Sequence, residues 1–148
     1  MIDFPTRSES LSLSLGVLCD HALIGQDGKL SLIGIFDHIG VSQLPAQHPR
    51  FFVVVVLQGN ASDRQVEMEF VAPDGRSLMH EAIPIDPQAV AQGNGKLLAE
   101  INMLVLDQPG AFEFRVSGGG RVLGSIPLHV DQVQPEQHIT GPTPVPRA

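Results

Sequence analysis

The sequence predicts an all-β protein, an antiparallel β-sandwich of about seven to eight strands with an immunoglobulin-like topology. Three observations lead to this fold class. Short apolar segments recur along the 148 residues, at intervals of about 10 to 15 residues, and several alternate with the period of two that marks a half-buried strand. The 15 glycines and 12 prolines are spread between these segments as turn signals. No stretch has the length and periodicity of an amphipathic helix.

The first two predicted strands form a hairpin. In the first strand one face is formed by alternating residues, namely Leu11, Leu13, Leu15, Val17 and Cys19. The turn signal GQDG at residues 25–28 separates it from a second strand over residues 30–36, which is apolar on both faces. Matching the apolar faces of the two strands predicts that the first strand's apolar row faces Leu30, Leu32, Gly34 and Phe36.

The most apolar segment is FFVVVVL at residues 51–57. It is too short to cross a bilayer as a helix, and β-branched valine disfavours helix. We interpret it as a central strand covered on both faces. An exposed docking edge is the alternative.

The remaining elements follow from alternation and turn chemistry. Strands are predicted around Val66 to Phe70 and over residues 77–85, 97–106, 111–116 and 121–130. Asp86 and Pro87 predict one helical turn, with Asp86 as the N-cap and Pro87 at the first helical position. The predicted organisation is a flexible lead over residues 1–10, one β-sandwich domain over residues 11–131, and a flexible Pro-rich tail over residues 132–148.

Composition and charge argue against several function classes. Nine basic residues face 16 acidic ones, for a net charge of -7, and the basic residues are scattered along the chain. Binding to nucleic acid or to an anionic membrane surface depends on clustered Lys and Arg, so we expect neither. The single cysteine cannot form an internal disulfide, and the first residues lack a signal-peptide pattern. A cytoplasmic location is therefore expected.

Cys19 and His21 are the candidate metal ligands, because residues two apart in a strand face the same way. His38 would be the third ligand. Under the predicted hairpin pairing His38 falls about 13 to 20 Å from His21, at about 3.3 Å per residue, whereas zinc ligands sit about 2.0 to 2.3 Å from one metal. We therefore predict no metal site and no cofactor, and interpret Cys19 as a small buried apolar side chain. The same burial argues against a nucleophilic thiol.

Other chemistry-bearing patterns have simpler interpretations. Glu67 and Glu69 share one face of a strand, which is typical of a solvated surface. The glycine run at residues 118–120 is interpreted as a hairpin turn, because no helix follows it to bind phosphate. The motif of a serine hydrolase is absent from the sequence. We therefore predict no catalytic residues and no enzyme activity.

Seven segments resemble the pattern of an uncharacterised family of small bacterial all-β proteins. They are VLCDHA at residues 17–22, GKL at 28–30, IGIFD at 33–37, HP at 48–49, DG at 74–75, PG at 109–110 and PL at 127–128. The resemblance extends over roughly residues 15–130 and implies a bacterial origin and a single β domain. It implies no activity, cofactor or catalytic residue.

Taken together, the sequence predicts a non-enzymatic interaction or assembly module that acts through a protein partner or through self-association. One alternative is a structural component of a phage or secretion-type assembly. Another is a small metal- or ligand-binding protein that uses Cys19 and His21.

Overall fold

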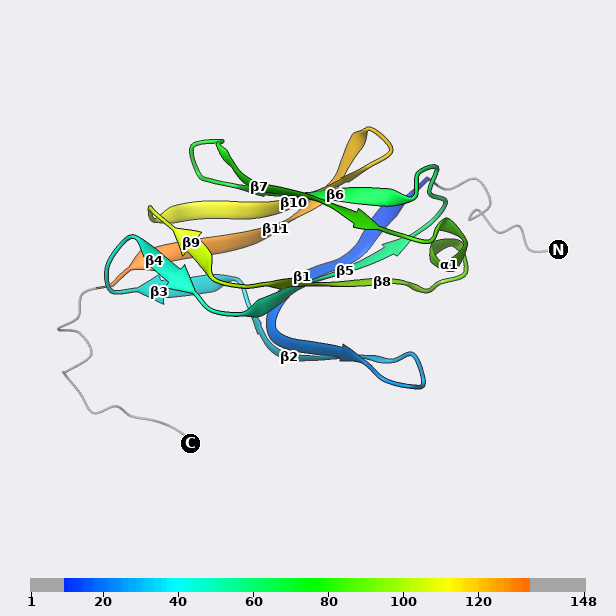
Figure 1. Ribbon diagram of the computed structural model, residues 1–148, viewed down its shortest axis with the longest axis horizontal. Coiled ribbons are helices and arrows are strands. Elements are labelled where there is room, and N and C mark those ends of the chain that lie inside the picture. Colours follow the sequence, from blue (N-terminus) through cyan, green and yellow to red (C-terminus); the bar gives the residue numbers. More distant parts are fainter. Residues whose placement is uncertain (1–9, 134–148) are drawn as a thin grey trace.

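The computed structural model describes residues 10–133 as two β-sheets packed face to face (Figure 1). The described residues form eleven strands and one short helix. In chain order these are β1 (Ser12–Ile24), β2 (Leu30–Phe36), β3 (His38–Val41), β4 (Ala46–His48), β5 (Phe51–Gln58), β6 (Gln65–Val71), β7 (Ser77–Pro84), α1 (Pro87–Ala91), β8 (Gly95–Ile101), β9 (Leu104–Leu106), β10 (Gly110–Gly118) and β11 (Arg121–Gln132).

One sheet has four strands in the order β2-β1-β5-β8, and the other has five in the order β3-β11-β10-β6-β7. Strands β4 and β9 form a separate two-stranded sheet. The predicted fold class, an immunoglobulin-like β-sandwich, is confirmed by this arrangement. The pairing of these strands is antiparallel except between β3 and β11, which run parallel. The strand count exceeds the prediction because β3 and β4 are short strands that the sequence did not indicate, and because one predicted strand is divided into β8 and β9.

Strand β5 is the central strand that the sequence predicts. It lies between β1 and β8, and one of its faces packs against the five-stranded sheet in the main core. The side chains on this inner face are Phe51, Val53, Val55 and Leu57. Phe52 and Val54 point the other way and are buried in a second apolar cluster. The prediction that this segment is covered on both faces is confirmed, and the alternative of an exposed edge is wrong.

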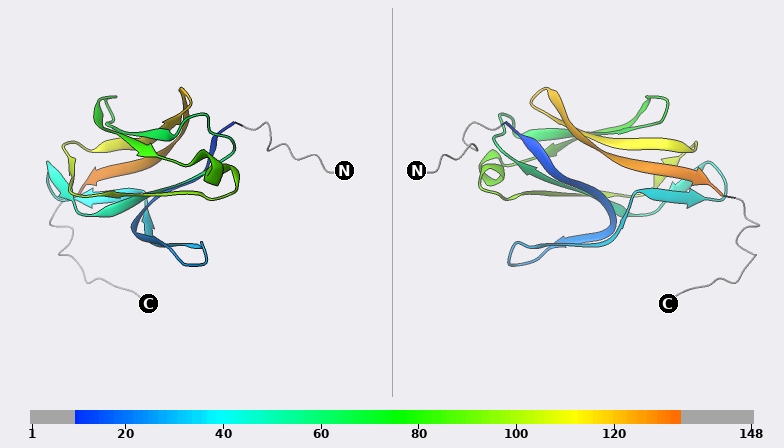
Figure 2. Two further views of the ribbon diagram at one scale, coloured as in Figure 1. Left: turned by 45° about the vertical axis from the view of Figure 1, so that its right-hand side comes forward. Right: turned by 180° about the vertical axis from the view of Figure 1, so that it is seen from behind.

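The second cluster exists because β1 bends. The pairing of β1 with β5 ends at Cys19, and β1 then curves away so that its hairpin with β2 lies below β5 (Figure 2). Ala22 from β1 and Leu30 and Leu32 from β2 then pack against Phe52 of β5. The turn that closes this hairpin is the predicted one, with the Gly25 amide donating to the Lys29 carbonyl at 2.8 Å.

The predicted single apolar row in β1 is wrong. The register with β5 shifts between Leu13 and Leu15, so a β-bulge reverses which side chains face the core. Leu11 and Leu13 lie against the main core, while Cys19 lies in the second cluster and Leu15 is partly exposed. Leu18 lies outside the predicted row, which predicts that it faces away from the core. It is instead fully buried in the main core.

The pairing of β1 with β2 also differs from the predicted one. Cys19 lies opposite Ile35 and His21 opposite Ile33, whereas matching of apolar faces placed Gly34 and Phe36 in that row. The closing contact between Gly25 and Lys29 sets this register, because turn length fixes hairpin pairing.

Of two other local predictions, the helical turn is confirmed and the long strand over residues 97–106 is wrong. The helical turn is confirmed, since Asp86 caps α1 by accepting from the Gln88 amide at 3.1 Å and Pro87 is the first helical residue. The single strand predicted over residues 97–106 is wrong. It breaks into β8 and β9 at Met103, a non-glycine residue with a φ of 56°.

Most of the predicted lead and tail, residues 1–9 and 134–148, lies outside the described residues. Gln132 falls in the predicted tail, but it belongs to β11.

Candidate functional site

Cys19 and His21 lie where β1 bends. The Cys19 side chain is fully buried in the second cluster, and its Sγ donates to the His21 carbonyl at 3.3 Å. Burial raises the pKa of the Cys19 thiol, which keeps it neutral and a poor nucleophile or ligand. The His21 ring is exposed and meets the Phe52 ring edge-on, with 5.8 Å between centroids. The two side chains therefore sit in different environments.

His38 lies in the other sheet, away from this pair. Its Nε2 is 2.6 Å from Asp131 Oδ2, and His129 Nε2 is 3.7 Å from the other oxygen of the same carboxylate. The two imidazole rings are side by side, 5.4 Å apart, because His38 and His129 are paired across β3 and β11. Over residues 10–133, no group of three or more His, Cys, Asp and Glu side chains has a geometry that could hold a metal ion.

An aromatic corner that the sequence did not indicate lies at the end of β4. The His48 ring packs against Phe36 and Phe51, with centroid distances of 5.6 and 5.3 Å. Burial lowers the pKa of His48, and the charge of Asp20 acts in the opposite direction with the smaller effect. The ring is thus kept neutral and joins the base of the hairpin to the main core.

Glu67 and Glu69 do not form a carboxylate pair that acts on one substrate. Glu67 accepts from Gln65 Nε2 at 2.8 Å and lies 3.0 Å from His80 Nε2. Glu69 faces Arg115, at 4.0 Å. Each carboxylate therefore has its own polar partners across the sheet surface, as the interpretation of a solvated face requires.

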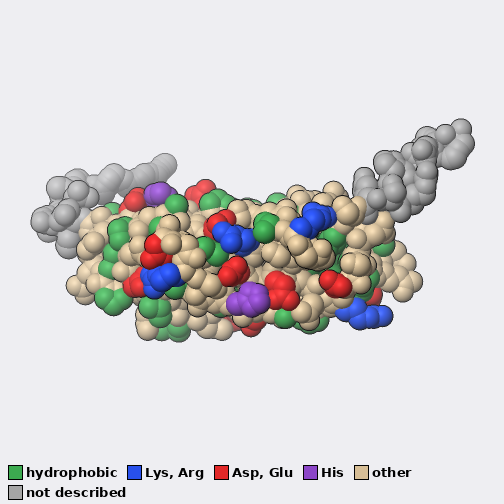
Figure 3. Space-filling model, turned by 90° about the horizontal axis from the view of Figure 1, so that it is seen from above, with side chains coloured by type: hydrophobic (Ala, Val, Ile, Leu, Met, Phe, Trp, Pro, Cys, Tyr) green, Lys and Arg blue, Asp and Glu red, His purple; other side chains and the backbone are tan. Residues whose placement is uncertain are grey.

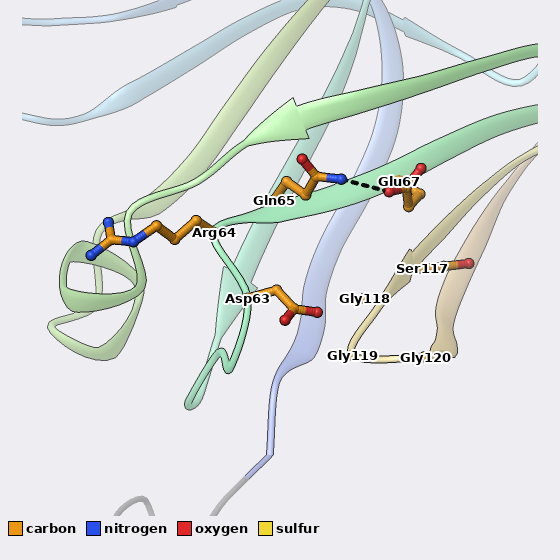
Figure 4. A pocket seen from close by; sticks show the side chains of 8 residues that line it. All are labelled: Asp63, Arg64, Gln65, Glu67, Ser117, Gly118, Gly119 and Gly120. Atoms are coloured by element: carbon orange, nitrogen blue, oxygen red, sulfur yellow. Dashed lines mark hydrogen bonds between the residues drawn. The ribbon is translucent and has the colours of Figure 1, made fainter.

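A polar hollow of about 530 Å³ lies beside Glu67 (Figure 4). One wall carries Asp63, Gln65 and Glu67, and the other is the glycine turn at residues 118–120. The Asp63 carboxylate points toward the glycine turn, while the Arg64 side chain points away from it. The hollow is lined by carboxylates and by the backbone of the glycine turn.

The outer face of the five-stranded sheet is covered by charges of both signs (Figure 3). The Arg115 guanidinium donates to Glu113 at 2.7 Å and, together with Ser125, holds the pKa of that carboxyl below its ordinary value. Interspersed charges of this kind keep a sheet face solvated and discourage apolar contacts.

The opposite side of the molecule carries an exposed apolar surface on the β1–β2 hairpin. Its outward side chains are Leu23, Ile33 and Ile35, of which the two isoleucines are each 61% exposed and Leu23 is 45% exposed. We call these three residues the hairpin face. Figure 1 shows β2 lying below β1, β5 and β8, at the edge of the four-stranded sheet. Exposed apolar patches are a common mark of interaction sites on folded proteins.

Sequence reasoning missed the hairpin face because residues 30–36 are apolar on both sides of the strand. That pattern predicts a strand whose apolar side chains cover the first strand. The signal that could have revealed it is the contrast with residues 51–57, which are β-branched throughout the middle, whereas residues 30–36 include Ser31 and Gly34.

The chain belongs to a family of unknown function, DUF6941, whose sequence pattern it matches over residues 14–131. No curated protein is a significant match in sequence. Among solved structures, the chain is similar to an immunoglobulin-like protein from Pseudomonas aeruginosa, at 14% sequence identity and a TM-score of 0.46. That likeness covers 81% of this chain and 95% of the other. In the described part of the chain, no helix has the length and apolar character needed to cross a membrane.

Proposed function

We propose that this protein is a non-enzymatic interaction module of the bacterial cytoplasm that docks a protein partner on the hairpin face. The observation that carries the proposal is the pair Ile33 and Ile35, both 61% exposed on a strand at the edge of a sheet. Exposure of two large aliphatic side chains to water is unfavourable. A partner that buries them gains free energy, because burial of an isoleucine contributes about 1.5 to 3 kcal/mol.

Two further observations and one general property of strand edges support the proposal. The net charge of -7 and the scattered basic residues favour a protein partner over nucleic acid or an anionic membrane. The thiol of Cys19 is buried and neutral, which disfavours the alternative of a metal or ligand site built from Cys19 and His21. Apolar strand edges bind partners by adding a strand, so that backbone hydrogen bonds and alternate side chains act together.

A position-specific cross-linking experiment tests the proposal. A photo-reactive amino acid is placed at Ile33 in one variant and at Val122 in another, and cells that make the protein are irradiated. Val122 is the matched control, since it is also aliphatic and on a strand and is 56% exposed. We expect discrete protein adducts from position 33 and few from position 122. Equal yields from the two positions, or none from position 33, would refute docking on the hairpin face.

A further inference from the structure

The two sheets have four edge strands in the described part of the chain, and β2 is unlike the other three. Strand β8 carries Lys96 and Glu100, and β7 carries Glu81 and Pro84. Strand β3 has only four residues. Charges, prolines and short length are the features that protect sheet edges from pairing with another chain. Strand β2, with the sequence LSLIGIF, has seven residues and none of these features.

The free edge of β2 presents a defined set of backbone groups. The Gly25 amide donates to the Lys29 carbonyl, so the backbone of Lys29 is directed toward β1. Backbone direction alternates along an antiparallel strand. The backbone groups of Leu30 and Leu32 are therefore directed toward the free edge, and the positive φ of Gly34, 73°, interrupts the regular alternation before Phe36.

These groups match a second copy of the same strand. If two β2 strands pair antiparallel about Ile33, Leu30 lies opposite Phe36 of the other copy and Leu32 lies opposite Gly34. Leu30 and Leu32 supply backbone groups that point to the free edge in each copy, and the glycine at position 34 has the conformational freedom to complete the hydrogen-bonded ladder opposite Leu32. Ile33 then lies opposite Ile33 of the other copy as a non-hydrogen-bonded pair, where side chains approach closely.

The same register brings opposite charges together at both ends of the strand. Residues Lys29 and Asp37 flank β2, and antiparallel pairing about Ile33 places Lys29 of each copy opposite Asp37 of the other. The Lys29 side chain is 85% exposed and has one loose ion pair, 3.8 Å to Asp27. Within residues 10–133, the Asp37 carboxylate has no ion-pair partner. Two charge pairs would thus frame an uncharged strand.

From this complementarity we infer that the partner of the hairpin face is a second copy of this chain, bound through antiparallel pairing of β2 with β2. The inference rests on the proposed function and names its partner. The pairing joins two four-stranded sheets into one of eight strands and brings the Ile33 and Ile35 side chains of both copies into one apolar strip. A two-fold, isologous contact of this kind closes on itself and gives a dimer.

Charge reversal tests the register. Light scattering on the full chain is expected to give a molar mass that doubles with rising concentration. Lys29→Asp and Asp37→Lys should each weaken self-association at least tenfold, because each creates two like-charge pairs. An equimolar mixture of the two variants should restore a one-to-one dimer, since the two substitutions then place opposite charges across both ends of the paired strands. Lys96→Asp on edge strand β8 has the same charge change as Lys29→Asp and should leave the dimer intact.

Cysteine pairing tests the same register by a covalent readout. Ile33→Cys should form an intermolecular disulfide on mild oxidation, because non-hydrogen-bonded partners lie about 4.5 Å apart at their Cα atoms, within disulfide range. Ile35→Cys is the matched control, equally exposed, and its two copies would be about 13 Å apart at about 3.3 Å per residue. Disulfide formation at equal rates in both variants would overturn the inference.

The outcomes separate this inference from the proposed function. A wild-type chain that stays monomeric at every concentration, while position 33 still cross-links to a different protein, overturns self-pairing and leaves docking on the hairpin face in place. A dimer that is indifferent to both charge reversals also overturns the inference, because it must use another surface. A monomer with no adduct at position 33 removes both proposals.

Discussion

Strands β5 and β2 are both apolar, but the fold places them in opposite situations. Strand β5 lies between two neighbours, with the main core on one face and the β1–β2 hairpin on the other. Strand β2 lies at the edge of the same sheet, and only the face that carries Leu30 and Leu32 is covered. The hairpin thus buries the outer face of β5 while leaving its own outer face, with Ile33 and Ile35, in water. An apolar strand is part of the core or a binding surface according to its place in the sheet.

The largest expected difference between the strands is in their contribution to stability. Phe51 on β5 is fully buried and meets the rings of Phe36, His48 and Phe114. Phe51→Ala should lower the free energy of unfolding by about 3 to 5 kcal/mol, through lost burial and the cavity left behind. Urea denaturation followed by circular dichroism measures this. A loss below about 1 kcal/mol would contradict the central role assigned to β5.

The next largest effect on stability is expected at Gly34, where β2 meets the bent part of β1. Gly34 of β2 has a φ of 73°, and a Cβ at this position would meet the Asp20 carboxylate. We expect Gly34→Ala to destabilise the fold by about 1 to 3 kcal/mol, through backbone strain and the close approach of Asp20. The measurement is again the free energy of unfolding in urea.

Gly28→Ala provides the control for Gly34→Ala. Gly28 has a similar φ of 84°, but a Cβ there meets nothing within 4 Å. The cost of Gly28→Ala thus reports backbone strain alone, and Gly34→Ala should cost more. Adding Asp20→Ala to Gly34→Ala should recover the difference. Equal costs for the two alanine variants would mean that Asp20 does not constrain the hairpin.

A smaller effect on stability should appear at high pH, where the buried thiol of Cys19 begins to ionise. The pKa of Cys19 is raised above its ordinary value of 9.0 by burial. Below pH 9.0 the thiol is neutral in both states, so its contribution to stability is fully present. As the pH rises further the unfolded thiol ionises first, and stability falls by up to about 1.4 kcal/mol per pH unit.

Comparison with Cys19→Ala isolates this effect. The variant has no thiol to ionise, so the stability difference between wild type and variant should shrink as the pH rises from 8 to 10 (about one unit on either side of the ordinary thiol value). Urea unfolding at each pH measures the difference. A difference that does not change with pH would show that the Cys19 thiol is accessible to water in the native state.

These contrasts also show which features can be predicted from sequence. Local chemistry predicted residues 30–36 as a strand and the N-cap at Asp86, because both depend on neighbours in the chain. The bulge between Leu13 and Leu15 was missed, since it depends on how β1 meets β5. The break at Met103 was missed because no glycine or proline marks it in the sequence.

The hairpin face could not be predicted either, because its exposure depends on how distant parts of the chain pack together. Cys19 was correctly interpreted as a buried apolar side chain. The exposure of Ile33 and Ile35 depends on β2 being an edge strand and on the hairpin folding beneath β5, neither of which is a local property. A strand that is apolar on both sides has the same sequence pattern whether a second layer covers it or a partner does.

The smallest expected effect on folding is at the hairpin face, and it completes the comparison with β5. Ile33 is 61% exposed, so Ile33→Thr removes few contacts within the chain, and threonine keeps the branched Cβ that a strand favours. At low protein concentration, where the chain is monomeric, the free energy of unfolding should change by no more than about 0.5 kcal/mol. The same substitution should weaken self-association, because the side chain that meets its own copy becomes polar. A loss of stability above about 1 kcal/mol in the monomer would mean that Ile33 supports the fold as β5 does.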